Sequence, residues 1–146
     1  MLPGGHDSLI QAETHGTDAQ LRQMQAIGKT LWKAGLPVLD DLHNVSYDWP
    51  VEDGAKNDEK KLIESRTAQF IEGVKSLKPG VTMMIMHCTA PTEVFQHISG
   101  SGPGRKGDLL VMKNPAFKQA LLEERITLTT WRELMQRRTA LKQTEK

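Results

Sequence analysis

The chain has little cysteine, no long apolar run and almost no net charge. Its 146 residues include one cysteine, Cys88, so an internal disulfide is impossible and a reducing compartment is compatible. No stretch approaches the roughly 20 apolar residues of a membrane-spanning helix. The formal net charge of +1 provides no general attraction to nucleic acid, to a membrane surface or to an acidic ligand. We therefore expect no nucleic-acid partner and no membrane association.

The amino-terminal segment lacks the features of an export signal. Residues 1–17 have neither the basic region nor the apolar region of a signal peptide, which predicts a cytoplasmic protein. These residues show no hydrophobic period, so Met1 falls within a loop. The composition, 38% hydrophobic and 25% charged, suits a folded domain with one core. We expect a single domain over 1–146, with a loop at 1–17 and a frayed tail at 139–146.

Periodic apolar residues predict helices that alternate with short strands. In chain order we expect a helix at about 18–34, a strand at 37–42, a loop at 43–57, a helix at about 58–77, a strand at 81–86, a loop at 88–113, a short helix from about 114, a strand at 126–129 and a final helix that opens with a capping box at 130–133. This alternation is typical of parallel βα units, so the expected fold class is α/β. Ligand sites in such folds gather at the carboxyl ends of the strands.

A histidine stands at the end of the most apolar of these strands. Residues 81–86 are nearly all apolar and predict a strand that is buried on both faces of a parallel sheet. His87 follows directly, and an imidazole there can act as a general acid or base. A histidine that only ends the strand and bonds a neighbour is an equal alternative. The side chain of Cys88 points to the opposite face, and we expect it to be a buried, inert thiol.

Acidic and imidazole groups also follow the strand at 37–42. Asp40, Asp41 and His43 carry oxygen and nitrogen atoms that suit Zn²⁺ or Mn²⁺. Their run lacks the spacing of a known ligand set. A polar transition from strand to loop is therefore the favoured interpretation of these residues.

The glycine-rich stretch at 99–107 superficially resembles a phosphate-binding loop but lacks the spacing of one. We expect instead a flexible loop that carries Arg105 toward the site. Arg105 and Asp108 would pair with each other or bind a polar ligand through the guanidinium. A pair of residues on a surface loop has equal weight.

The second half of the chain resembles the end of the YdjC-like (ChbG-type) carbohydrate deacetylases. The resemblance is carried by KPGVTMMIMHCTAP, then RKGDLL, then NPAFKQALLEERITLTTWREL. In that family a Pro-Gly precedes an apolar strand that ends in His. An Arg-x-x-Asp or Arg-x-x-Glu segment follows, and then a helix, a short strand and a closing Trp/Tyr-Arg-Glu/Asp-Leu. The similarity covers about residues 35–138 and is most specific over 78–134.

The resemblance implies a distorted TIM-like (β/α) barrel, of which this chain would form the carboxyl-terminal part. Members of the family remove acetyl groups from N-acetylated sugars or oligosaccharides with a divalent metal, Mg²⁺ or Zn²⁺, that polarises the amide and activates water. By motif position, His87 would protonate the leaving amine or stabilise the oxyanion, and Arg105 and Asp108 would orient the site. The family's metal ligands lie in an amino-terminal Asp-Asp motif and in histidines after it. That segment has no counterpart here, so no residue is assigned to a metal.

Three functions stay open at this point. The first is the carboxyl-terminal part of a deacetylase-like enzyme that is inactive alone. The second is a non-catalytic binding or partner module of the same origin, whose exposed apolar sheet edge would associate with a partner, a second copy included. The third is an unrelated α/β hydrolase with a dyad of His87 and either Asp40 or Asp41.

Overall fold

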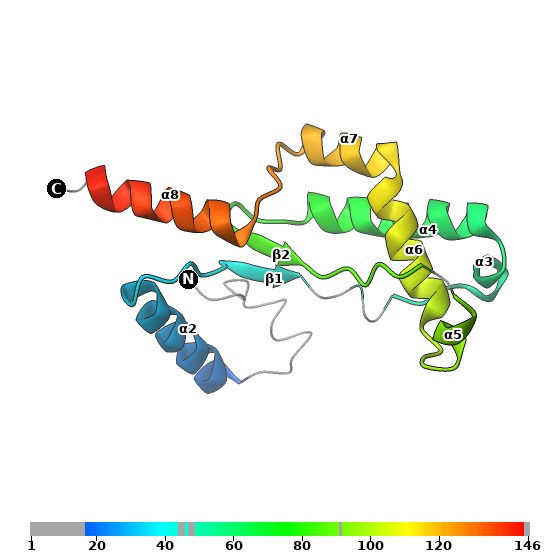
Figure 1. Ribbon diagram of the computed structural model, residues 1–146, viewed down its shortest axis with the longest axis horizontal. Helices are drawn as coiled ribbons and strands as arrows, with labels where there is room; N and C mark the ends of the chain where they lie inside the picture. The colour runs from blue at the N-terminus through cyan, green and yellow to red at the C-terminus, as the bar shows by residue number, and fades with distance from the viewer. Residues whose placement is uncertain (1–16, 44–45, 47–48, 91, 145–146) are drawn as a thin grey trace. The chain divides into compact units, whose positions relative to one another are not determined.

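The computed structural model describes residues 17–43, 46, 49–90 and 92–144, and this part of the chain contains both helices and strands (Figure 1). In chain order its elements are α2 (Asp18–Lys33), β1 (Asp41–His43), α3 (Asp53–Lys56), α4 (Glu59–Lys75), β2 (Thr82–Met84), α5 (Glu93–Gln96), α6 (Gly102–Lys113), α7 (Pro115–Glu123) and α8 (Trp131–Thr144). Strands β1 and β2 pair in parallel, with Leu42 opposite Met83. The mixed helix and strand class expected from the sequence is therefore confirmed.

The chain divides into two compact units. Unit 1 comprises residues 1–43, 79–84 and 127–146, and unit 2 comprises residues 44–78 and 85–126. Unit 1 thus contains α2, α8 and the strand pair, whereas unit 2 contains α3 to α7. Among the described residues, no helix combines the length and the apolar character needed to cross a bilayer. The expected single domain over 1–146 stays a prediction.

The ends of the unit 1 helices follow local capping rules. Thr17 and Gln20 form a reciprocal capping box at the start of α2, and Gly35, with φ of 97°, ends the helix where a left-handed residue is needed. At α8 the carboxylate of Glu133 accepts the Thr130 N–H at 2.7 Å, which confirms the predicted capping box. Each of these contacts joins residues a few positions apart, so the sequence alone predicts it.

The strands differ from the expectation. β2 covers Thr82–Met84 rather than 81–86, and Met83 is 40% exposed, so burial on both faces is wrong. β2 pairs only with β1 among the described residues, and a parallel strand is buried on both faces only where layers cover both. No strand forms at 126–129. There the chain closes α7 with a turn, in which the Ile126 N–H donates to the Leu121 carbonyl at 2.8 Å and Arg125 has φ of 56°.

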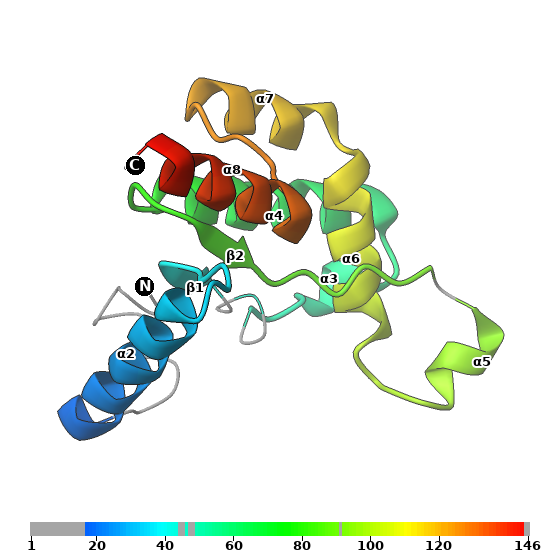
Figure 2. The ribbon, with the colours of Figure 1, turned by 60° about the vertical axis from the view of Figure 1, so that its left-hand side comes forward.

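Unit 2 is built around α4, which contacts α3, α6 and α7. Figure 2 shows α6 crossing α4 while α7 runs along it. The buried face of α4 includes Leu62, Phe70 and Val74, which recur at helical spacing. The Phe70 ring lies edge-on to two others, with centroid distances of 4.9 Å to Trp49 and 6.1 Å to Phe117. This cluster is the apolar core of unit 2.

The predicted loop at 88–113 is wrong, because it contains α5 and the twelve-residue α6. Residues 102–107 of the glycine-rich stretch form the first half of α6, where Pro103 suits a helix start. Because Gly107 has no side chain, α6 can pack closely against α4 at this position. A Cβ atom at this position would lie 2.6 Å from Arg66 Cγ and 3.3 Å from Leu62 Cδ1. Glycine is required there for packing rather than for flexibility.

We predict that Gly107→Ala lowers the free energy of unfolding by about 1–3 kcal/mol, because the added methyl group overpacks the α4–α6 contact. Denaturant unfolding followed by circular dichroism measures the change. The matched control is Gly54→Ala in α3, where a Cβ would meet no atom within 4 Å. The control is expected to leave stability unchanged or slightly raised. An equal loss in both variants would contradict this account of Gly107.

Candidate functional site

The centre of the site is a buried ion pair between α4 and α6. Arg66 Nη2 and Nε lie 2.9 Å and 3.2 Å from Asp108 Oδ1. The two side chains are 5% and 3% exposed. A buried charge pair tolerates this removal from water only where its geometry is good and its other polar atoms are also bonded. Both conditions hold here, as the remaining contacts of each residue show.

The other face of the Arg66 guanidinium is held by the segment before α3. Nη2 donates to the Ser46 carbonyl at 3.4 Å, and Nη1 donates to the Trp49 carbonyl at 3.5 Å. The guanidinium carbon lies 5.4 Å from the centroid of the Trp49 ring and 5.6 Å from that of Phe70, which is within cation–π range. Arg66 therefore links α4, α6 and the long connection after β1.

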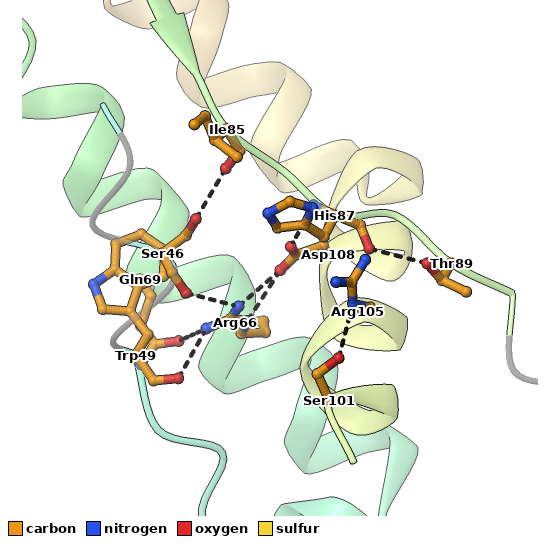
Figure 3. Close-up of polar contacts among 10 residues, drawn as sticks. All are labelled: Ser46, Trp49, Arg66, Gln69, Ile85, His87, Thr89, Ser101, Arg105 and Asp108. Atoms are coloured by element: carbon orange, nitrogen blue, oxygen red, sulfur yellow. Dashed lines mark hydrogen bonds and ion pairs between the residues drawn. The ribbon is translucent and has the colours of Figure 1, made fainter. Parts of the chain in front are cut away.

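The second carboxylate oxygen of Asp108 holds the segment that carries His87. Oδ2 accepts the backbone N–H of His87 at 2.8 Å. Figure 3 shows Arg66 and His87 converging on this carboxylate. Ser46 Oγ donates to the Ile85 carbonyl at 2.9 Å, which ties the same segment down two residues earlier. The main chain that presents the half-buried imidazole is thus fixed from two sides.

Arg105 lies on the first turn of α6. Its Nε donates to Ser101 Oγ at 2.8 Å, and its guanidinium carbon lies 5.7 Å from the centroid of the Phe95 ring. Its carbonyl accepts the Thr89 N–H at 3.2 Å. Asp108 pairs with Arg66 and not with Arg105, so the suggested Arg105–Asp108 pair does not form in the described part of the chain.

A cavity of about 430 Å³ brings the predicted site residues together. His87, Arg105 and Asp108 all line it, although 21 positions separate the first from the last. The cavity is also lined by Arg66, Lys56 and the residues at the start of α6. The arrangement can bind an oxygen-rich ligand through guanidinium and ammonium donors, and it offers one imidazole for proton transfer.

The residues around this cavity do not fit a divalent metal. Among the described residues of the lining Asp108 is the one carboxylate, and its two oxygens are engaged by Arg66 and by the His87 N–H. Three cationic side chains share the cavity with it, and they repel a metal cation. Within the residues that the structure describes, no group of three or more His, Cys, Asp or Glu side chains could hold a metal ion.

The sequence did not reveal Arg66 or Ser46 as parts of this site. The signal for Arg66 was a charged residue four positions from both Leu62 and Phe70, on the apolar stripe of a helix. A charge at such a position is rarely buried unless it is paired. For Ser46 the only hint was the length of the connection at 43–57, since long connections in compact domains often carry function.

The polar residues near β1 belong to unit 1 and have structural contacts. Asp40 Oδ2 accepts the Val81 N–H at 2.8 Å, and the Asp40 N–H donates to the Val81 carbonyl at the same distance. Asp41 Oδ1 accepts the N–H of its neighbour Leu42 at 2.8 Å. Burial lowers the pKa of His43, while a backbone hydrogen bond and the charge of Asp41 oppose this. Asp41 and His43 lie within β1 and Asp40 directly precedes it, so the predicted strand at 37–42 and the polar transition expected after it are wrong in position.

Cys88 is exposed, so the expected buried thiol is wrong. Partial desolvation raises the pKa of this thiol, and the negative charge of Asp108 raises it further. A raised pKa keeps the thiol protonated near neutral pH, and the protonated thiol is a poor nucleophile. The exposed thiol is therefore kept in its protonated form by partial desolvation and by the charge of Asp108, and not by being inaccessible.

We predict that Arg66→Met costs about 3–5 kcal/mol of unfolding free energy, because it leaves the Asp108 carboxylate buried without its partner. Removing both charges, in Arg66→Met with Asp108→Leu, is expected to cost less than the sum of the single changes. Denaturant unfolding of the four proteins of this cycle gives the coupling. The control is Lys75→Met, also on α4, which breaks an exposed pair with Glu72 and should change stability little. Additive single changes would contradict a coupled buried pair.

A second prediction concerns pH and His43. Its pKa is lowered in the folded state, so below about pH 6.5 the unfolded chain binds a proton that the folded chain resists. Stability is therefore expected to fall as the pH decreases through this value, down to the folded pKa. His43→Gln should remove this part of the pH dependence in unfolding curves measured between pH 5 and pH 8. The control is His97→Gln, which removes an exposed histidine and should leave the pH dependence unchanged. An identical pH profile for His43→Gln and the wild type would refute the assignment of this pH dependence to His43.

No protein-family model matches the chain, and no curated protein and no solved structure is significantly similar to it. The function proposed below therefore rests on the geometry of unit 2 and on the motifs of the sequence.

Proposed function

We propose that the chain carries the proton-transfer and substrate-positioning side of a carbohydrate deacetylase site of the YdjC-like (ChbG-type) kind. The observation that carries this proposal is the convergence of His87, Arg105 and Asp108 on one cavity of unit 2. The family motifs in the sequence single out the same three residues. Their shared cavity supports a common role for them.

In the proposed reaction His87 is the catalytic residue. In the complete site of the family, water would add to the acetyl carbonyl carbon, and the His87 imidazole would donate a proton to the amide nitrogen as the C–N bond breaks, so that acetate and the free amine leave. Arg105 would bind substrate oxygens through the guanidinium nitrogens that do not donate to Ser101. Asp108 and Arg66 are positioning residues, because Asp108 holds the His87 main chain and Arg66 holds Asp108.

We assign no residue of this chain to the metal of the family, because the cationic side chains and the bonded carboxylate of the described lining do not suit a metal cation. We infer that the chain alone binds an N-acetylated sugar without hydrolysing it. The proposed fold is a partial TIM-like barrel in which β1 and β2 are neighbouring parallel strands.

A second candidate is a non-catalytic binding module of the same origin. It is favoured by apolar side chains that unit 1 leaves exposed. On α2 these are Met24, Ile27 and Leu31, which are 39%, 49% and 38% exposed. An apolar helix face of this kind often marks a contact with a partner. Association with a second copy of the chain belongs to this candidate.

The primary proposal is tested by titrating the purified chain with N,N′-diacetylchitobiose and following backbone amides by NMR. We expect shifts at residues 87, 101, 102, 104 and 105, and smaller ones with cellobiose, which lacks the N-acetyl groups. Arg105→Met should weaken binding by about tenfold, which corresponds to one lost charged contact. The matched control is Lys113→Met at the other end of α6, which is exposed and lies outside the cavity.

Three results would contradict the proposal. The first is an unchanged spectrum at the highest sugar concentration, and the second is equal affinities of the Arg105→Met and wild-type chains for the sugar. The third is release of acetate by the chain with added Mg²⁺ or Zn²⁺, which would refute the inference that it binds without hydrolysis. His87→Ala is expected to keep sugar binding within a few-fold, because the proposed role of the imidazole is proton transfer.

A further inference from the structure

Unit 1 contains a groove that has no part in the site of unit 2. It has a volume of about 850 Å³ and lies between α2, α8 and the residues that precede β1 and β2. Much of its surface is apolar, contributed by Trp32, Pro37, Val38, Val81 and Leu134. Cavities of roughly 300–1,000 Å³ with an apolar lining and few polar groups are typical of small-molecule sites.

Arg138 of α8 lines this groove, and it is only 6% exposed. Its Nη2 donates to the carbonyl of Trp32, and its guanidinium carbon lies 3.8 Å from the centroid of the Trp32 ring. Its Nε and Nη1 are buried and have no hydrogen-bond partner among the described residues. No carboxylate of the described part of the chain forms an ion pair with it.

A guanidinium does not release its proton at any ordinary pH, so Arg138 stays charged. A buried charge without an opposite charge is strongly unfavourable, and a cation–π contact offsets only part of the loss. Asp40 is the one carboxylate among the described residues of the lining, and its Oδ2 is already engaged by the Val81 N–H. In the described part of the chain, no anion therefore bonds Arg138, the most buried polar side chain of the groove.

The other charged residues of the lining add to this imbalance. Lys29, Lys33 and Arg137 also line the groove and are exposed. Together with Arg138 they create a positive potential over an apolar surface, which attracts an anion that carries an apolar body.

We propose that the unit 1 groove binds a small amphiphile with an apolar chain and one carboxylate, and that the carboxylate pairs with Arg138. Access to the guanidinium requires a shift of the indole that covers it. Trp32 is 44% exposed and lies one residue before the end of α2, so its ring has room to move. This assignment is independent of the function proposed for unit 2.

The test is calorimetric titration of the whole chain with decanoate, below its micelle concentration, beside decan-1-ol as an uncharged ligand of equal chain length. We expect one molecule of decanoate per chain and an affinity about tenfold higher than that for decan-1-ol, as one ion pair contributes. Arg138→Met should abolish this advantage and leave the affinity for decan-1-ol unchanged. The matched control is Arg132→Met on the same helix, which lies outside the groove and should bind as the wild type does.

Equal affinities of the wild-type chain for decanoate and decan-1-ol would overturn the proposal, and this comparison needs no variant to fold. Equal decanoate affinities of folded Arg138→Met and wild type would also overturn it. So would the absence of saturable decanoate binding, the result expected if an acidic peptide or a second copy of the chain occupies the groove instead.

Discussion

The buried ion pair between Arg66 and Asp108 is the constraint on which unit 2 depends. Arg66 reaches the connection before α3 with two of its nitrogens, and Asp108 reaches the His87 main chain with its second oxygen. The pair also explains Gly107, since only a residue without a side chain lets α6 come close enough to α4 over Arg66. Ser46, Trp49 and His87, which form hydrogen bonds with Arg66 or Asp108, thus also line the cavity.

The two units treat a buried arginine in opposite ways. In unit 2, Arg66 has a carboxylate, two carbonyl oxygens and aromatic rings around it. In unit 1, Arg138 has a carbonyl and one aromatic ring, but no carboxylate among the described residues. The same physical rule, that a buried charge requires an opposite one, accounts for the packing of the first and for the proposed ligand of the second.

The charges around the unit 2 cavity also limit its chemistry. Asp108, the one carboxylate among the described lining residues, holds the His87 backbone and Arg66, so both of its oxygens are already bonded. The other charged side chains of the described lining are cationic. This arrangement favours neutral or negatively charged oxygen atoms over cations, and the proposed role of His87 in proton transfer is compatible with it.

The sequence by itself determined the features that depend on neighbouring residues. The capping boxes at Thr17 and Thr130, the Asn114 cap of α7 and the positions of α2, α4 and α8 follow from contacts within a few positions, which any chain with these residues can form. The tertiary structure alone decided the partner of Asp108, the helix in the glycine-rich stretch and the exposure of Met83. Those outcomes depend on residues tens of positions apart, and local propensity carries no information about which distant surface will cover a helix, a strand or a charge.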